Sequence, residues 1–227
     1  MKNTARIAGV FYLLVFVLGS FAALTGGRYV VSGNPAATAA NIRAHATAFR
    51  LGWTLNMITT ASYVVVTALF YQLFKAVNRS VSLTAAFFSL TGCIVGAATS
   101  VFSLGPLAVL ESSYYTSVFK KDQLEAIAYA LARLNSSNSS LVFFGFYCVL
   151  IGWLITQSTL MPRFVGIAMI IAGCGWLTFL WPPLARSLSP FNFAPGVVGE
   201  AVLTVWLLVK GVDEHSVAMN NLAHATA

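Results

Sequence analysis

Glu200 is the residue of this sequence that could most readily take part in chemistry. It lies inside the apolar run 194–212, which has the length and composition of a membrane-spanning helix. A carboxylate at that depth is costly unless it faces protein, water or a cationic partner, so such residues mark ion, proton or ligand sites. Glu200 is therefore the first candidate site residue, as an acid, a base or a charge partner.

Three further polar residues could converge on Glu200. Arg50 opens a second predicted span, and Asn56 lies six residues further along it. Six residues of helix rise about 9 Å, which is also the predicted depth of Glu200 in its own span. Tyr147, in another span, could add a hydroxyl group. The sequence thus suggests a polar cluster of Glu200, Arg50, Asn56 and Tyr147. This cluster is either a structural ion pair between helices or a ligand or proton site.

The composition places the chain among polytopic membrane proteins. Hydrophobic residues make up 58% of the 227 residues and charged residues only 8%, whereas soluble domains carry roughly 25% charged residues. The net charge of +7 comes from 13 Lys and Arg residues, which are scattered at the ends of apolar runs. Cations placed in this way suit anionic lipid headgroups and do not indicate nucleic-acid binding.

Six apolar segments predict six transmembrane helices in an all-α membrane bundle. They cover residues 7–24, 50–74, 81–109, 141–157, 164–181 and 194–211. Gly105 and Pro106 are expected to kink or end the third segment. Residues 35–49 and 120–134 predict one or two short amphipathic helices outside the membrane. Residues 1–212 form one predicted domain, followed by a polar, flexible tail at 213–227.

An even number of spans places both termini on the same side of the membrane. The short connections and helix ends on that side carry cations, whereas the connections on the other side are long and dilute in charge. The positive-inside rule gives most weight to short loops. We therefore expect both termini to be cytoplasmic, in the inner or plasma membrane.

The motifs of familiar catalytic and metal sites are missing from the sequence. Cys93, Cys148 and Cys174 have no CxxC spacing and lie inside apolar runs. No HExxH, GxSxG or phosphate-binding loop occurs. We therefore predict no metal site, no cofactor and no catalytic residue.

Several short blocks, spread over nearly the whole chain, form a pattern when they are taken together. They lie at residues 5–13, 49–52, 75–79, 143–148, 160–166, 172–173, 199–200 and 206–211. In this order they resemble the bacterial integral membrane proteins called domain of unknown function 4386. The family pattern often has His where this chain has Tyr147, and Arg where it has Ser89, so a site built on those groups would not carry over. The resemblance implies a multi-helix inner-membrane protein and no particular activity.

These observations favour a noncatalytic membrane protein. It would be a small transporter, a binder of lipid or another hydrophobic ligand, or a partner subunit of a membrane complex. The alternative is a membrane-embedded lipid-modifying enzyme with Glu200 as acid or base, which would need a second polar group beside it. The expected partners are membrane lipids, a small hydrophobic ligand and, in a homo-oligomer, further copies of the chain, but not nucleic acid.

Overall fold

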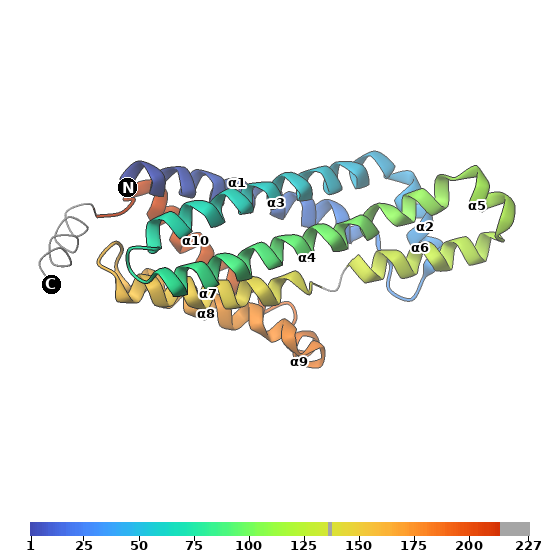
Figure 1. Cartoon of the computed structure of the whole chain (residues 1–227). Helices are drawn as coiled ribbons and strands as arrows, with labels where there is room; N and C mark the ends of the chain where they lie inside the picture. Colours follow the sequence, from blue (N-terminus) through green and yellow to red (C-terminus); the bar gives the residue numbers. More distant parts are fainter. Residues whose placement is uncertain (136–137, 214–227) are drawn as a thin grey trace, which may run out of the picture. The chain divides into compact units, whose positions relative to one another are not determined.

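The computed structural model describes residues 1–135 and 138–213, and this part of the chain consists of helices and their connections, without a strand (Figure 1). The predicted all-α class is confirmed. Short 3-10 turns follow the first helix at Gly27–Tyr29 and the eighth at Thr178–Leu180. The predicted tail lies, from residue 214 on, outside the described residues. The α-helices are α1 (Lys2–Gly26), α2 (Pro35–Ala44), α3 (Ala46–Phe74), α4 (Arg79–Glu111), α5 (Ser113–Val118), α6 (Lys121–Asn135), α7 (Ser140–Gln157), α8 (Arg163–Leu177), α9 (Pro182–Leu188) and α10 (Phe193–Val209).

Five segments of the described chain are each long and apolar enough to cross a membrane. The predicted sixth span corresponds to α10, which has 17 residues. Helices α9 and α10 are long and apolar enough to cross a membrane only when they are taken together, and they are bent by 82° at their junction. The protein is therefore a polytopic membrane bundle with five spans, or six where the bent pair is one span. The five segments are Lys2–Ala22, Ala46–Phe74, Arg79–Glu111, Ser140–Gln157 and Arg163–Leu180.

Two of the differences from the predicted helix boundaries lie at His45 and at Pro106. The helix predicted over residues 35–49 is split at His45, because α2 ends at Ala44 and α3 already begins at Ala46. The helix predicted to end near residue 109 continues through Pro106 to Glu111. Membrane helices tolerate proline, and Pro106 lies inside α4 without ending it.

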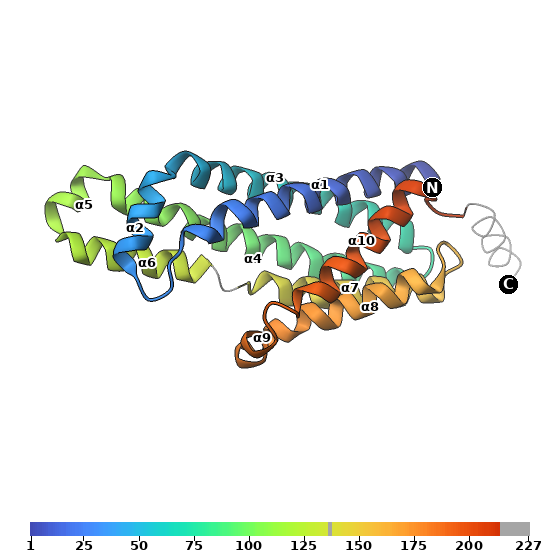
Figure 2. The same ribbon diagram turned by 180° about the vertical axis from the view of Figure 1, so that it is seen from behind.

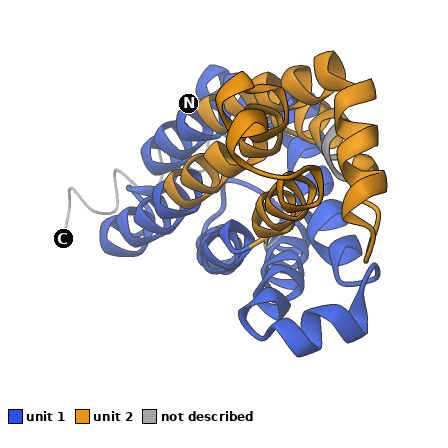
Figure 3. Ribbon diagram, turned by 90° about the vertical axis from the view of Figure 1, so that its right-hand side faces the viewer, with its two compact units in different colours: residues 1–14, 62–93, 139–227 blue, residues 15–61, 94–138 orange. Residues whose placement is uncertain are grey.

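The described residues form two compact units (Figure 3). Unit 1 comprises Met1–Leu14, Ser62–Cys93 and the chain from Ser139 on, and unit 2 comprises Val15–Ala61 and Ile94–Asn138. Helices α1, α3 and α4 contribute residues to both units. Each unit is assembled from separate stretches of chain. The single domain over residues 1–212 stays a prediction.

Glycines bring α7 and α8 of unit 1 into backbone contact. A Cβ atom on Gly152 would lie 2.5 Å from the carbonyl oxygen of Gly166, and one on Gly166 would lie 2.6 Å from that of Gly152. Gly145 and Gly173 face each other in the same reciprocal way. Small residues at such positions let apolar helices approach closely in a membrane, where no hydrophobic driving force joins them.

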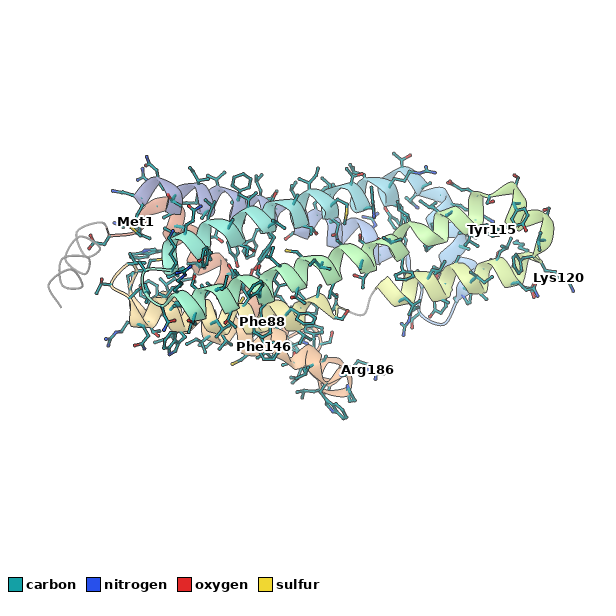
Figure 4. The ribbon with its side chains drawn as sticks, in the orientation of Figure 1. Met1, Phe88, Tyr115, Lys120, Phe146 and Arg186 are labelled. Atoms are coloured by element: carbon teal, nitrogen blue, oxygen red, sulfur yellow. The ribbon has the colours of Figure 1, made fainter. Side chains whose placement is uncertain are left out.

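Helix α10 also packs on α8, as Figure 2 shows from behind. Between α4 and α7, the rings of Phe88 and Phe146 stack with their centroids 4.9 Å apart (Figure 4). The interior of unit 1 contains large side chains with less than 2% exposure. They are Tyr12, Phe70, Leu73, Phe74, Tyr147, Ile151, Leu154, Ile155, Met169, Leu203 and Leu207.

Unit 2 contains the short helices α2, α5 and α6, and α2 and α6 pack against each other. On α6 the buried residues are Leu124, Ala128 and Ala132, whereas Ile127 and Leu134 are 36% and 57% exposed. The helix is amphipathic, as predicted. The core of unit 2 consists of Tyr29, Ala39, Ile42, Phe49, Leu107, Leu110 and Ala128.

Candidate functional site

Helix α10 places Glu200 in the interior of unit 1. Gly196 and Gly199 of this helix lie directly against α8, where an added Cβ atom would collide with Trp176 or Ala168. This close approach turns the neighbouring Glu200 towards the bundle, and the residue is only 8% exposed. Glu200 therefore faces protein, as the cost of a lipid-exposed carboxylate requires.

Three neutral donors from three other helices surround the Glu200 carboxyl group. The indole N–H of Trp176 in α8 donates to Oε1 at 2.6 Å. The thiol of Cys148 in α7 approaches the same oxygen at 3.7 Å, and the hydroxyl of Tyr12 in α1 donates to Oε2 at 3.2 Å. In the described part of the chain, no Lys, Arg or His side chain pairs with Glu200. Hydrogen bonds thus solvate this group, but no cation neutralises it.

A second tyrosine continues the hydrogen bonding away from the carboxyl group. The hydroxyl oxygen of Tyr63 in α3 lies 3.1 Å from that of Tyr12. A phenol has one proton to donate, so while Tyr12 donates to Glu200, the contact between the tyrosines is donated by Tyr63. The hydrogen bonds therefore run from Tyr63 through Tyr12 to Glu200. We name Tyr12, Tyr63, Cys148, Trp176 and Glu200 the Glu200 cluster.

Tyr147 lies beside the Glu200 cluster. Its ring centroid is 6.0 Å from that of Tyr63 and 6.4 Å from that of Phe70. The residue is 1% exposed, and its hydroxyl has no hydrogen-bond partner among the described residues. A buried hydroxyl without a partner costs about 1–3 kcal/mol. Tyr147 is therefore a group that could bond to a water molecule or to a polar group entering the cluster.

The structure gives Arg50 and Asn56 other surroundings than the sequence suggested. Arg50 forms an ion pair with Glu111 at 2.5 Å, and the two side chains are 54% and 42% exposed. Asn56 is exposed, and both residues belong to unit 2. The expected pairing of Arg50 with Glu200 is thus replaced by an Arg50–Glu111 pair and by neutral donors at Glu200. Of the four predicted site residues, unit 1 holds Glu200 and Tyr147.

Sequence reasoning did not name Tyr12, Tyr63, Cys148 or Trp176 as site residues. Aromatic residues of membrane segments are commonly assigned to interfacial belts or to the core, and cysteines to the core. The feature of the sequence that could have indicated Tyr12 and Tyr63 is their position within the apolar segments. Tyr12 and Tyr63 lie near the middle of α1 and α3, far from headgroups, where a phenol needs an internal partner.

The Glu200 cluster is chemically suited to exchanging a proton. Its acid has a donor on each oxygen, and its members are otherwise a thiol, an indole and two phenols. A divalent cation would instead require several oxygen, nitrogen or thiolate ligands. Within residues 1–135 and 138–213, no three His, Cys, Asp or Glu side chains come together as such ligands would.

The family model of a domain of unknown function (DUF4386) matches residues 7–211 of the chain. The chain belongs to this family. The resemblance noted in the sequence is thereby confirmed, and every residue of the Glu200 cluster lies within the DUF4386 match.

One relative of this DUF4386 protein is an uncharacterized protein of Archaeoglobus fulgidus. The two are 25% identical over 151 residues, which is 65% of this chain and 76% of the relative. No solved structure matches the chain. The family is one of unknown function, so the function of this chain has to be argued from the site.

Proposed function

We propose that the protein is a noncatalytic membrane protein, a small transporter in which the Glu200 cluster binds and releases a proton. The observation that carries the proposal is the burial of Glu200 among neutral donors. An ionised carboxylate without a cationic partner is destabilised inside a bundle. One proton removes this cost while the carboxyl group keeps its hydrogen bonds. The cluster thus has two states that differ by a proton.

The two tyrosines give the proton a route to and from the acid. With Glu200 ionised, Tyr63 donates to Tyr12 and Tyr12 donates to the carboxylate. With Glu200 protonated, its O–H can donate to Tyr12, and Tyr12 can then donate to Tyr63. When Tyr63 takes up a proton from outside the cluster, each hydroxyl passes one proton on as it receives another, so only O–H bonds are broken and formed. Buried acids of this kind occur in the proton relays of pumps and transporters.

The same contacts favour a transporter over the other roles considered. A binder of lipid or another hydrophobic ligand, or a partner subunit, needs an apolar surface and gains nothing from a buried acid. A lipid-modifying enzyme would need Glu200 to reach its substrate. Both oxygens of Glu200, however, accept hydrogen bonds from side chains of its own bundle.

The proposed location is the inner or plasma membrane, with both termini in the cytoplasm. Cations stand at the helix ends and short connections of that side, at Lys2, Lys75, Arg79, Arg163 and Lys210. The positive-inside rule gives most weight to short loops, and the cations of this side lie in short connections and at helix ends, which supports this orientation.

A pH jump applied to proteoliposomes on a solid-supported membrane tests the proposal. A proton that binds within the membrane moves charge across part of its thickness, so the wild-type protein should give a transient current. Glu200→Gln keeps an acceptor oxygen but cannot take up the proton, and it should lose this current. Tyr63→Phe, which interrupts the hydroxyl chain, should slow it.

Glu111→Gln is the matched control, since it removes an acid that lies in an exposed ion pair. Its current should equal that of the wild type. Equal currents from the wild type and Glu200→Gln would rule out Glu200 as the proton site.

A further inference from the structure

A hollow of about 780 Å³ lies at the ends of α1, α8 and α10 in unit 1. Its walls come from Lys2 at the start of α1, from residues 159–163 between α7 and α8, and from Trp206 and residues 210–213 at the end of α10. Sites for small molecules have volumes of roughly 300–1,000 Å³. None of the lining residues belongs to the Glu200 cluster.

The hollow carries a net positive charge. Lys2, Arg163 and Lys210 line it together with one acid, Asp213, so three cations and one anion leave a net charge of +2. All four residues are exposed. In the described part of the chain, the side chains of Arg163 and Lys210 have no hydrogen bond or ion pair. An anion bound between them would relieve their mutual repulsion.

Close contacts hold together the chain segments that carry these cations. Gly211 follows α10 with a φ of +73°, and its N–H donates to the carbonyl of Trp206 at 3.0 Å, so the chain turns sharply at the helix end. The N–H of Asp213 then donates to the carbonyl of Leu160 at 3.1 Å, which joins this segment to the α7–α8 connection. A Cβ atom on Gly211 would lie 3.2 Å from Cγ of Lys2, so glycine also lets α1 come close.

One side of the hollow is aromatic. The half-buried Trp206 lines it, and its ring packs edge to face on Phe164, with centroids 5.6 Å apart. Phe164 is 54% exposed and follows Arg163 directly. Aromatic rings beside cations at the end of a span are typical of the zone where lipid headgroups meet acyl chains.

We infer that this hollow binds a phosphate-bearing anion, and that its occupant in the membrane is the headgroup of an anionic phospholipid. Arg163 meets the phosphate with its planar fork of donors, and Lys210 and Lys2 add point charges. The acyl chains lie along the exposed ring of Phe164. The binding is independent of the proton site proposed above.

The test is a titration of the full-length protein in detergent, with binding counted by native mass spectrometry. The probes are dioctanoyl phosphatidylglycerol, dioctanoyl phosphatidylcholine and inorganic phosphate. Phosphatidylglycerol should bind at least about tenfold more tightly than either of the others. The double substitution Arg163→Gln with Lys210→Gln should weaken its binding about tenfold or more, because two charge-assisted contacts are lost.

The matched control is Lys75→Gln with Arg79→Gln, which removes two exposed cations of unit 1 that do not line the hollow. Its affinity should stay within about twofold of the wild type, and an unchanged melting temperature will show that both double variants fold. Inorganic phosphate binding as tightly as the lipid would overturn the lipid as occupant and leave a free-phosphate site. Unchanged lipid binding by the Arg163 and Lys210 variant would overturn the site itself.

Discussion

At the scale of the residue, the behaviour of Glu200 follows from the chemical type of its partners. Trp176, Cys148 and Tyr12 can each donate one hydrogen bond, but none brings a full positive charge. An arginine in their place would hold the acid permanently ionised. Neutral donors leave both protonation states accessible, which a carrier of protons requires.

The Glu200 cluster predicts a difference in stability between two substitutions of its acid. Glu200→Gln keeps a carbonyl oxygen for the donors, and it should cost little. Glu200→Ala leaves the buried indole N–H of Trp176 without its acceptor, whereas Tyr12 can still donate to Tyr63, and a buried unpaired group costs about 1–3 kcal/mol. Thermal unfolding of both variants in one detergent measures the difference, and equal melting temperatures would show that these hydrogen bonds do not stabilise the fold.

The burial of Glu200 could be predicted from the sequence, whereas its partners could not. A charge inside an apolar run has to face inward, so one residue sufficed for that prediction. The partner depends on how α1, α3, α7 and α8 are rotated about their axes. These helices are apolar on nearly every side, so hydropathy does not show which face holds Tyr12 or Trp176. The positive charge of Arg50 suggested it as the partner of Glu200, whereas in the structure Arg50 pairs with Glu111.

At the scale of the element, glycine contacts between α7 and α8 hold the scaffold of the cluster. Cys148 lies on α7 between Gly145 and Gly152, and Trp176 lies on α8 shortly after Gly173. The reciprocal contacts of these glycines fix the distance between the two helices. Both donors to Oε1 of Glu200 therefore depend on the α7–α8 packing.

Gly152→Ala should destabilise the protein, because its methyl group would lie 2.5 Å from the carbonyl oxygen of Gly166. Overpacking of this kind costs about 1–3 kcal/mol. Gly19→Ala in α1 is the control, since its Cβ would lie at an ordinary 3.5 Å from Thr59, and alanine favours helix by about 1 kcal/mol over glycine. Thermal unfolding should place Gly152→Ala below the wild type and Gly19→Ala at or above it. The opposite order would contradict the packing role of Gly152.

At the scale of the whole molecule, hydropathy and length predicted the class of the protein. Runs of about 20 apolar residues leave few alternatives to spanning helices. The five segments that are each long and apolar enough to cross a membrane correspond to the first five predicted spans. Hydropathy predicted the last span less well, because α10 has 17 residues and is bent by 82° from α9. Pro182 and Pro183 mark a break in the sequence but do not give its angle.

Six spans predict that both ends of the chain lie on one side of the membrane. A fluorescent protein fused after Asp213 should therefore mature in the cytoplasm of a bacterial host, and alkaline phosphatase fused there should be inactive. Alkaline phosphatase fused after Glu111, beyond the third span, should be active. Active phosphatase after both Glu111 and Asp213 would mean that α10 does not complete a crossing.

The most direct measurement is an infrared difference spectrum of the reconstituted protein between acidic and alkaline pH. A protonated carboxyl group has a carbonyl band that a carboxylate lacks, and burial keeps this band separate from those of exposed acids. The wild type and Glu111→Gln should both show the band of a buried carboxyl group, and Glu200→Gln should lack it. A spectrum of Glu200→Gln identical to that of the wild type would contradict the claim that Glu200 exchanges a proton.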